Sequence, residues 1–323
     1  MSGLDTGCRS AQASLPPPAL WGSPAAMSQA PVQSGGSELL HGGPSALPVA
    51  LRSLINSPQF SDVSFVVGRQ RQVVHAHRCI LTCRCKVFHT MFSRQPPQDA
   101  PVPFVLADVQ PEVFLAVIEF IYTNSVTLDR LIALEVLTAA VEYGLTDLRK
   151  LCVDFISRTL TVDVASEALQ AAVTYGQSDL RQKCLAFIER HTEEVLKAQS
   201  FRELSDLGIV SILQSDRLAI DEVPLIQAVR QWAYVSSAVL DVPVSVVAQG
   251  AVRELRLVLL SPDELATLER ENAKDDLIPE MQIAQAWKFH ALKKVSDSHP
   301  HHFQRRRGTL VREHHHYLDL PSK

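Results

Sequence analysis

The stretch SDVSFVVGRQRQVVHAHRCILTCRCKVFHTMF (61–92) decides the fold, because it supports two incompatible interpretations. On the first, it is a metal site, since five candidate ligands fall within eleven positions: His75, His77, Cys79, Cys83 and Cys85. On the second, it forms two short strands followed by two helical turns that pack on a core. The second interpretation leaves this stretch without chemistry of its own and favours an interaction scaffold.

The spacing of these side chains disfavours a metal ion. Structural zinc sites use about four nitrogen or sulfur ligands, commonly spaced C-x2-4-C and H-x3-5-H. Here the pattern is H-x-H-x-C-x3-C-x-C, and no second cluster lies nearby in the sequence. In a helix Cys79 and Cys83 share a face, whereas Cys85 points away. We therefore expect no metal and no other cofactor, and interpret these cysteines as small hydrophobic residues of a core.

A reactive thiol at Cys85 is the alternative of another class. Arg84 and Lys86 flank this residue and would stabilise its thiolate, which would make the protein a redox- or metal-responsive switch. A catalytic cysteine also needs a base and an orienting group. The sequence contains no nucleophile elbow, zinc-protease motif, phosphate-binding glycine loop or dinucleotide fingerprint. It therefore predicts a non-enzymatic protein that takes no small-molecule substrate.

Composition and charge exclude further classes. The chain is 46% hydrophobic and 20% charged with a formal net charge of -4, which is not the balance of a general binder of nucleic acids or anionic membranes. No apolar run reaches the ~20 residues of a membrane span, and the N-terminus lacks the layout of a secretory signal. The six cysteines do not form a disulfide framework, which indicates an intracellular and, in our interpretation, cytoplasmic protein.

The regions on either side of 61–92 differ in composition. Residues 1–46 are rich in Pro, Gly, Ser and Ala, which predicts a disordered leader. A short amphipathic helix follows, with apolar residues at i, i+3 and i+4: Leu51, Leu54 and Ile55. We expect three strands, at 63–67, 71–77 and 102–109, and mostly helices from Pro111 onward.

Two segments share the pattern A-A-V-x-Y-G-x-x-D-L-R-x-x-C, at 139–152 and again at 171–184. Gly144 and Gly176 are expected to end one helix in the left-handed conformation, and the Ser, Thr or Asp that follows to cap the next helix. The pattern predicts stacked helical hairpins, in too few copies for a long solenoid.

Further helices are expected up to about residue 294, and Trp232 and Trp287 are predicted core anchors on two of them. Residues 295–323 form a basic, histidine-rich polar tail. Its histidines could hold a transition metal, and its run Arg305–Arg307 could bind a nucleic acid or a localisation receptor. A solvated tail is the favoured interpretation.

Several of these residues resemble the signature of the BTB/POZ domain. The resemblance runs through Ser61-Asp62-Val63, Ala76-His77-Arg78, Leu81, Phe88, Met91-Phe92, Phe114 and 120–123. Residues 213–233 and 255–265 resemble the BACK domain that often follows it. The whole covers about 48–290, and the chain is identified as a member of the BTB/POZ–BACK family.

This resemblance implies a mostly α fold with a small β-sheet, followed by an all-α helical domain. We expect four parts: a leader (1–46), a BTB/POZ domain (47–160), a BACK-like domain (161–294) and the tail (295–323). In the family, Asp62 and His77 are signature positions that hold the strand–helix core together, and we expect them to form a buried pair.

The resemblance also implies partners. The first helix of such domains packs on its counterpart in a homodimer, so Leu51, Leu54 and Ile55 are the expected dimer interface. Many relatives are adaptors that dock cullin-3 for ubiquitination, through a loop that would begin here at Met91, Phe92, Ser93 and Arg94. Two departures weaken that role: 93–102 lacks the apolar-x-Glu motif, and no substrate-recognition repeat follows. The expected partners are a second copy and other proteins, with neither nucleic acid nor membrane.

Overall fold

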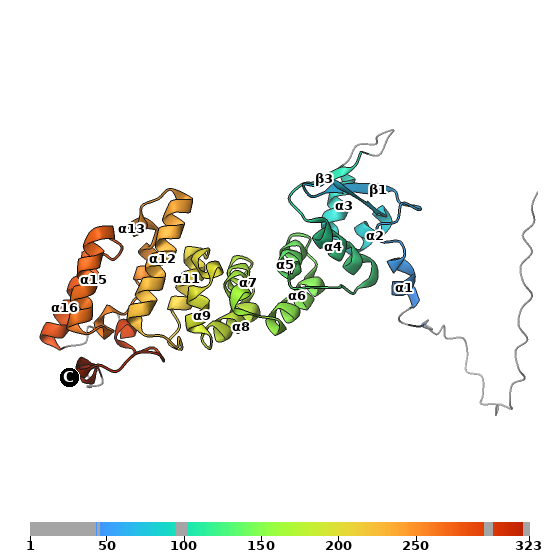
Figure 1. Cartoon of the computed structure of the whole chain (residues 1–323). Helices are drawn as coiled ribbons and strands as arrows, with labels where there is room; N and C mark the ends of the chain where they lie inside the picture. Colours follow the sequence, from blue (N-terminus) through green and yellow to red (C-terminus); the bar gives the residue numbers. More distant parts are fainter. Residues whose placement is uncertain (1–42, 44–45, 95–101, 294–299, 319–323) are drawn as a thin grey trace, which may run out of the picture. The chain divides into compact units, whose positions relative to one another are not determined.

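The structure is a computed structural model that describes Gly43 and residues 46–94, 102–293 and 300–318. Nearly all of the predicted leader lies outside these residues, as does 95–101 in the loop expected to face cullin-3. The first part of the described chain holds a three-stranded sheet and short helices (Figure 1). Its elements are α1 (Ala46–Arg52), β1 (Val63–Val67), β2 (Gln72–Ala76), α2 (Arg78–Arg84), α3 (Lys86–Ser93), β3 (Phe104–Leu106) and α4 (Pro111–Thr123).

All later elements are helical, which confirms a small α+β unit followed by an all-α region. They are α5 (Ala133–Glu142), α6 (Thr146–Arg158), α7 (Val162–Thr174), α8 (Ser178–Ile188), α9 (Thr192–Lys197), α10 (Gln199–Arg202), α11 (Asp206–Leu213), α12 (Glu222–Leu240), α13 (Val244–Val247), α14 (Gln249–Val252), η1 (Leu257–Leu259), α15 (Pro262–Asp275), α16 (Glu280–Leu292), η2 (Pro300–Phe303) and η3 (Glu313–Tyr317). None of the described helices is both long and apolar enough to span a membrane.

The sheet has the strand order β2-β1-β3, with β1 antiparallel to β2 and parallel to β3. The three strands lie within the predicted ranges. In β1 the residues of one face are buried in alternation, as its apolar pattern predicts. Gly68 ends β1 with a φ of +72°, and a Cβ there would press on the Pro111 ring, so the turn requires glycine.

The core of this first part is aromatic and is built largely from 61–92. Phe65 has no exposed surface, and its ring centroid lies 5.7 Å from that of Phe88 and 4.9 Å from that of Phe114. The rings of Phe92 and Phe104 also contact it. Two strands that run into two helical turns therefore account for this stretch, as the second interpretation predicts.

The repeated pattern forms two helical hairpins, α5–α6 and α7–α8. Gly144 and Gly176 have φ values of +68° and +63°, and the amide after each glycine donates to a carbonyl five residues back, at 2.8 Å. This is the Schellman arrangement. The predicted side-chain caps are wrong: Leu145 and Gln177 occupy the N-cap positions and neither side chain caps its helix.

The prediction of a solvated tail is also wrong. Residues 300–318 pack on the helical region, where Arg306 is 2% exposed and His315 1% exposed. We call residues 303–317 the strap. It lies across η1 and the loop between α11 and α12, and its contacts are with side chains and carbonyls distant in sequence (Figure 1).

Candidate interaction surfaces

The two signature residues serve the same helix start by different routes. The Asp62 carboxylate accepts a 2.7 Å hydrogen bond from the backbone N–H of Arg78, the first residue of α2. This bond satisfies one of the free amides of the helix N-terminus. Asp62 is exposed and forms hydrogen bonds with Arg78 and Ala76, but not with His77. The predicted buried Asp–His pair is therefore wrong, although both residues join strand to helix.

His77 is held by Tyr122 of α4. The Tyr122 hydroxyl accepts the His77 backbone N–H at 2.9 Å and lies 2.9 Å from His77 Nδ1, while Nε2 faces the Gln59 carbonyl at 3.4 Å. The neutral tautomer with the proton on Nε2 satisfies every one of these contacts, because Nδ1 then accepts the Tyr122 proton. Burial raises the pKa of Tyr122 to about 12, so the phenol keeps that proton.

The cysteines divide by exposure. Cys79 and Cys83 are exposed on α2, whereas Cys85 is 2% exposed and donates its thiol to the Tyr143 carbonyl at 3.3 Å. A reactive thiol must be accessible. Cys85 therefore does not suit the predicted role, and the packing prediction holds for Cys85 but not for the two exposed thiols. Within the described ranges, no group of three or more His, Cys, Asp or Glu side chains is arranged to hold a metal ion.

The predicted dimer interface mostly faces inward. Leu51, Leu54 and Ile55 are partly buried against the chain's own core, and α1 packs on α4. An ion pair at 2.5 Å between the half-exposed Arg52 and Glu119 ties the two helices together. The exposed large apolar residues of α1 are instead Leu47 and Val49.

The residues before the predicted cullin-facing loop are also divided. Phe92 is 8% exposed and lies under the Arg78 guanidinium, 4.8 Å from its ring centroid, so it is a core residue. Met91 is partly buried against the same core. Only Ser93 and Arg94 are exposed at the end of α3.

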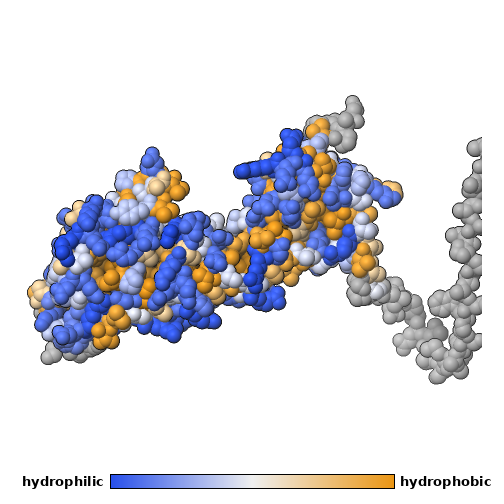
Figure 2. Space-filling model, viewed as in Figure 1, coloured by the Kyte–Doolittle hydropathy of each residue, from blue (hydrophilic) through white to orange (hydrophobic). Residues whose placement is uncertain are grey.

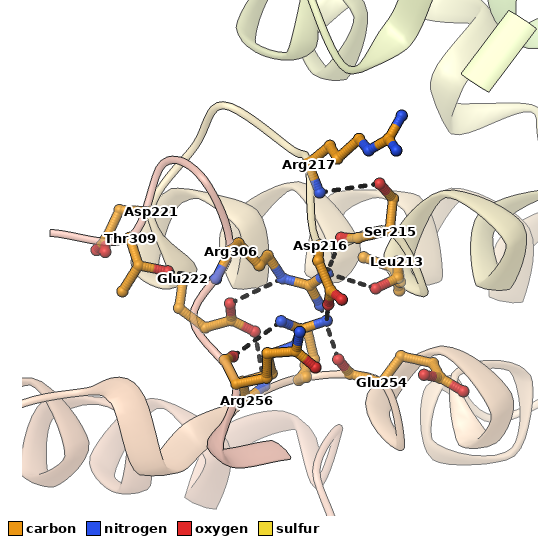
Figure 3. A network of polar contacts seen from close by, with 12 residues as sticks. Leu213, Ser215, Asp216, Arg217, Asp221, Glu222, Glu254, Arg256, Arg306 and Thr309 are labelled. Atoms are coloured by element: carbon orange, nitrogen blue, oxygen red, sulfur yellow. Dashed lines mark hydrogen bonds and ion pairs between the residues drawn. The ribbon is translucent and has the colours of Figure 1, made fainter. Parts of the chain in front are cut away.

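The strap inserts an arginine into the helical region, in a place that sequence patterns did not indicate (Figure 3). Arg306 Nε lies 3.2 Å from a Glu222 carboxylate oxygen, and both side chains have no exposed surface. Its terminal nitrogens donate to three carbonyls: Leu213 at 2.5 Å, Ser215 at 2.6 Å and Glu254 at 2.9 Å. We call these four acceptors the socket.

A second arginine closes the other end of the strap. Arg312 donates to Asp221 at 2.7 Å and to Glu264 at 2.6 Å, bridging the N-termini of α12 and α15. Hydrogen bonds from Arg312 hold the pKa of both carboxylates below their usual values, despite the opposing effect of burial. The Asp221 and Glu264 carboxylates therefore remain ionised at neutral pH.

Three histidines line the contact between the strap and η1. The Nε2 atoms of His314, His315 and His290 lie 3.0, 2.9 and 3.0 Å from three consecutive carbonyls, those of Val258, Leu259 and Leu260. Each Nε2 must carry a proton to donate there, so these atoms are not free to bind a metal. Burial, together with the neighbouring His290, His315 and Arg312, lowers the pKa of His314 to about 4.

The predicted tryptophan anchors differ in burial. Trp232 is 1% exposed and donates to the Leu204 carbonyl at 2.7 Å, as a core anchor should. Trp287 is only partly buried and donates to Glu269 at 3.1 Å.

Comparison with known proteins agrees with this architecture. Residues 51–160 match the BTB family, described as the BTB/POZ domain, and residues 165–270 match BACK, described as BTB And C-terminal Kelch. The chain therefore belongs to the BTB/POZ–BACK family, whose two domains are protein-interaction modules.

Two relatives that match most of the chain bear the same name. The chain is 54% identical over 285 residues to BTB/POZ domain-containing protein 19 of Bos taurus and of Homo sapiens, covering 88% of this chain and 98% of each relative. It is 28% identical over 220 residues to BTB/POZ domain-containing protein 3 of Homo sapiens, covering 66% of this chain and 42% of that relative.

Proposed function

We propose that this protein is a non-enzymatic scaffold or adaptor that forms a homodimer through its BTB domain. One observation carries the proposal. Leu47 and Val49 of α1 are 67% and 68% exposed. Aliphatic side chains so exposed on one helix turn favour burial against a second surface, and α1 of a second copy supplies one.

A further exposed residue, between α1 and β1 in the chain, supports an interface. Phe60 is 80% exposed and has a φ of +59°, which is unusual for a bulky residue. Aromatic side chains held outward in this way are frequent anchors of protein interfaces. Apolar residues are also exposed on one face of the sheet, where Val73 and Val105 both pair with Val66.

The dimer is tested by light scattering on the full chain and on its Leu47→Asp/Val49→Asp variant. The unmodified chain should elute as a dimer at ~10 μM, and the variant as a monomer, because two carboxylates would be buried at the contact. The matched control is Met281→Asp on α16, an equally exposed apolar residue (70%) outside the BTB domain, which should remain dimeric. A monomeric unmodified chain at this concentration would refute the dimer.

The alternative within this proposal is a cullin-3 adaptor. Family membership supports it, and Ser93 and Arg94 offer an exposed helix end, but the buried Phe92 is not available as a contact. Co-purification of cullin-3 with the full chain, beside an established adaptor, tests it. If cullin-3 co-purifies with the established adaptor but not with this chain, the alternative is refuted.

We further propose that the BTB domain spans 47–160 and the BACK domain 161–294, in an intracellular, cytoplasmic protein. The family matches at 51–160 and 165–270 support the division. The free cysteines of the described chain are consistent with a reducing compartment.

A further inference from the structure

The socket that holds Arg306 contains only hydrogen-bond acceptors. One carboxylate oxygen of Glu222 and the carbonyls of Leu213, Ser215 and Glu254 converge on one guanidinium (Figure 3). The other Glu222 oxygen accepts the Arg256 backbone N–H at 2.6 Å. An empty socket would therefore contain a buried carboxylate facing carbonyl oxygens, which is strongly unfavourable.

The geometry of the socket selects arginine over lysine. The four bonds leave from three different nitrogens of one planar group, in three directions. A guanidinium has five N–H donors in a fixed fork, whereas an ammonium has three donors on a single atom. Lysine could supply the charge but could not reach all four acceptors at once.

The two residues after Arg306 contact the helical region through their backbone. The amides of Arg307 and Gly308 donate to the carbonyls of Asp216 at 2.8 Å and Leu218 at 2.9 Å. Gly308 lies so close to the main chain of Ala219 and Ile220 that a Cβ would overlap it. This position of the strap therefore accepts glycine and excludes every residue with a side chain.

The contacts of Leu310 and Arg312 fix the spacing of the residues along the strap. The backbone N–H of Leu310 donates to Asp221 at 2.9 Å, and Arg312, six residues after Arg306, bridges Asp221 and Glu264. Between the two arginines, Leu310 and Val311 are 63% and 83% exposed, so their side chains make little contact. Residues 306–312 are thus held by two arginine side chains, one glycine and three backbone hydrogen bonds at set spacing.

We propose that the BACK domain contains a receptor site for a peptide of the form Arg-x-Gly-x-x-x-Arg, and that its resident ligand is the strap of the same chain. The site consists of the socket, the 216–221 backbone and the Asp221–Glu264 pair. It is independent of the BTB dimer contacts, so it does not rest on the proposed function. A partner can occupy it only by presenting the same pattern and displacing the strap.

Fluorescence anisotropy with a labelled peptide of residues 300–318 tests the site. The unmodified full chain should not bind the peptide, because the tethered strap has an effective concentration far above that of the free peptide. The full-length Gly308→Leu variant should bind it, because this change displaces the strap and leaves every socket residue in place. Unfolding is monitored by circular dichroism.

Matched peptides test the specificity. A peptide with Arg306→Lys should bind the Gly308→Leu chain at least ~10-fold more weakly. One with Arg307→Lys should bind as the parent does, because Arg307 bonds to the site through its backbone N–H and its side chain is exposed. Failure of the folded variant to bind the parent peptide, or equal binding of both lysine peptides, would overturn the proposal.

A second variant covers the case in which Gly308→Leu does not fold. The full-length Arg306→Ala/Arg312→Ala chain keeps the glycine, the site and the His314 and His315 contacts, but removes both arginine side chains that enter the site. Adding the free parent peptide should restore its thermal stability, and the Arg306→Lys peptide should not. Absence of this rescue would equally refute the site.

Discussion

Replacing Arg306 by alanine should detach the strap without unfolding the helices beneath it. Loss of one partner from a buried ion pair destabilises a protein by about 3–5 kcal/mol, because the remaining charge is left unpaired. We expect the lower end, about 3 kcal/mol, because Glu222 keeps its bond from the Arg256 amide and water can enter once the strap leaves. The loss is local, so it should appear as opening of the strap.

Hydrogen exchange followed by mass spectrometry measures this opening. The amides that bond to the helical region, those of Arg307, Gly308 and Leu310, should exchange ~100-fold faster in the variant. Arg307→Ala is the matched control. The Arg307 side chain is next to Arg306 in sequence but exposed, so its loss should cost less than ~0.5 kcal/mol.

The result that would refute the reasoning is equal protection in the two variants. It would mean that the socket contributes no more than an exposed arginine. A Glu222→Gln/Arg306→Ala chain refines the comparison, because it removes the unpaired charge. Its strap should still open, but the α12 start should be more stable than in Arg306→Ala alone.

Three further predictions concern other sites. Tyr122→Phe should lower the free energy of unfolding by about 1–3 kcal/mol in urea, because a buried N–H loses its acceptor. Tyr143→Phe removes a hydroxyl that forms no hydrogen bond with the described residues, so it should change this free energy by less than ~0.5 kcal/mol. The folded pKa of His314, about 4, lies below the unfolded value of ~6.5, so the unfolded chain takes up the proton first and stability falls as pH drops between these values. We expect a loss of about 1–2 kcal/mol after allowing for solvent at this partly exposed ring, measured by thermal unfolding at pH 7 and 4.5; a His314→Gln chain with the same pH dependence would contradict it. A maleimide should label the exposed Cys79 well before the buried Cys85 under native conditions, and labelling at equal rates would disprove the burial.

Local patterns were enough to predict most of the fold. Alternating apolar residues fix the face of β1, Pro111 begins α4, and Gly144 and Gly176 end their helices in the left-handed conformation. Each of these features depends on neighbours within a few residues, so the sequence alone reveals it.

The candidate surfaces were less predictable, because their contacts join distant residues. Arg306 is 84 residues from Glu222 and 93 from Leu213, and nothing in a run of arginines and histidines distinguishes a docked segment from a solvated one. The same limit explains the mistaken pairing of Asp62 with His77. Their residue types predicted buried polar bonds, but the partners, Arg78 and Tyr122, depend on how the helices pack.

The Arg52–Glu119 pair between α1 and α4 differs from the buried Arg306–Glu222 pair of the strap in its response to salt. The Arg52 side chain is 51% exposed, so dissolved ions can screen this attraction, and at ~1 M salt the Debye length of ~3 Å is about the length of the bond. Neither side chain of the Arg306–Glu222 pair has exposed surface, so dissolved ions do not reach it. A concentrated salt wash should therefore loosen the helix that carries Leu47 and Val49 while the far end of the described chain stays in place, so ionic strength can vary the two contact regions separately.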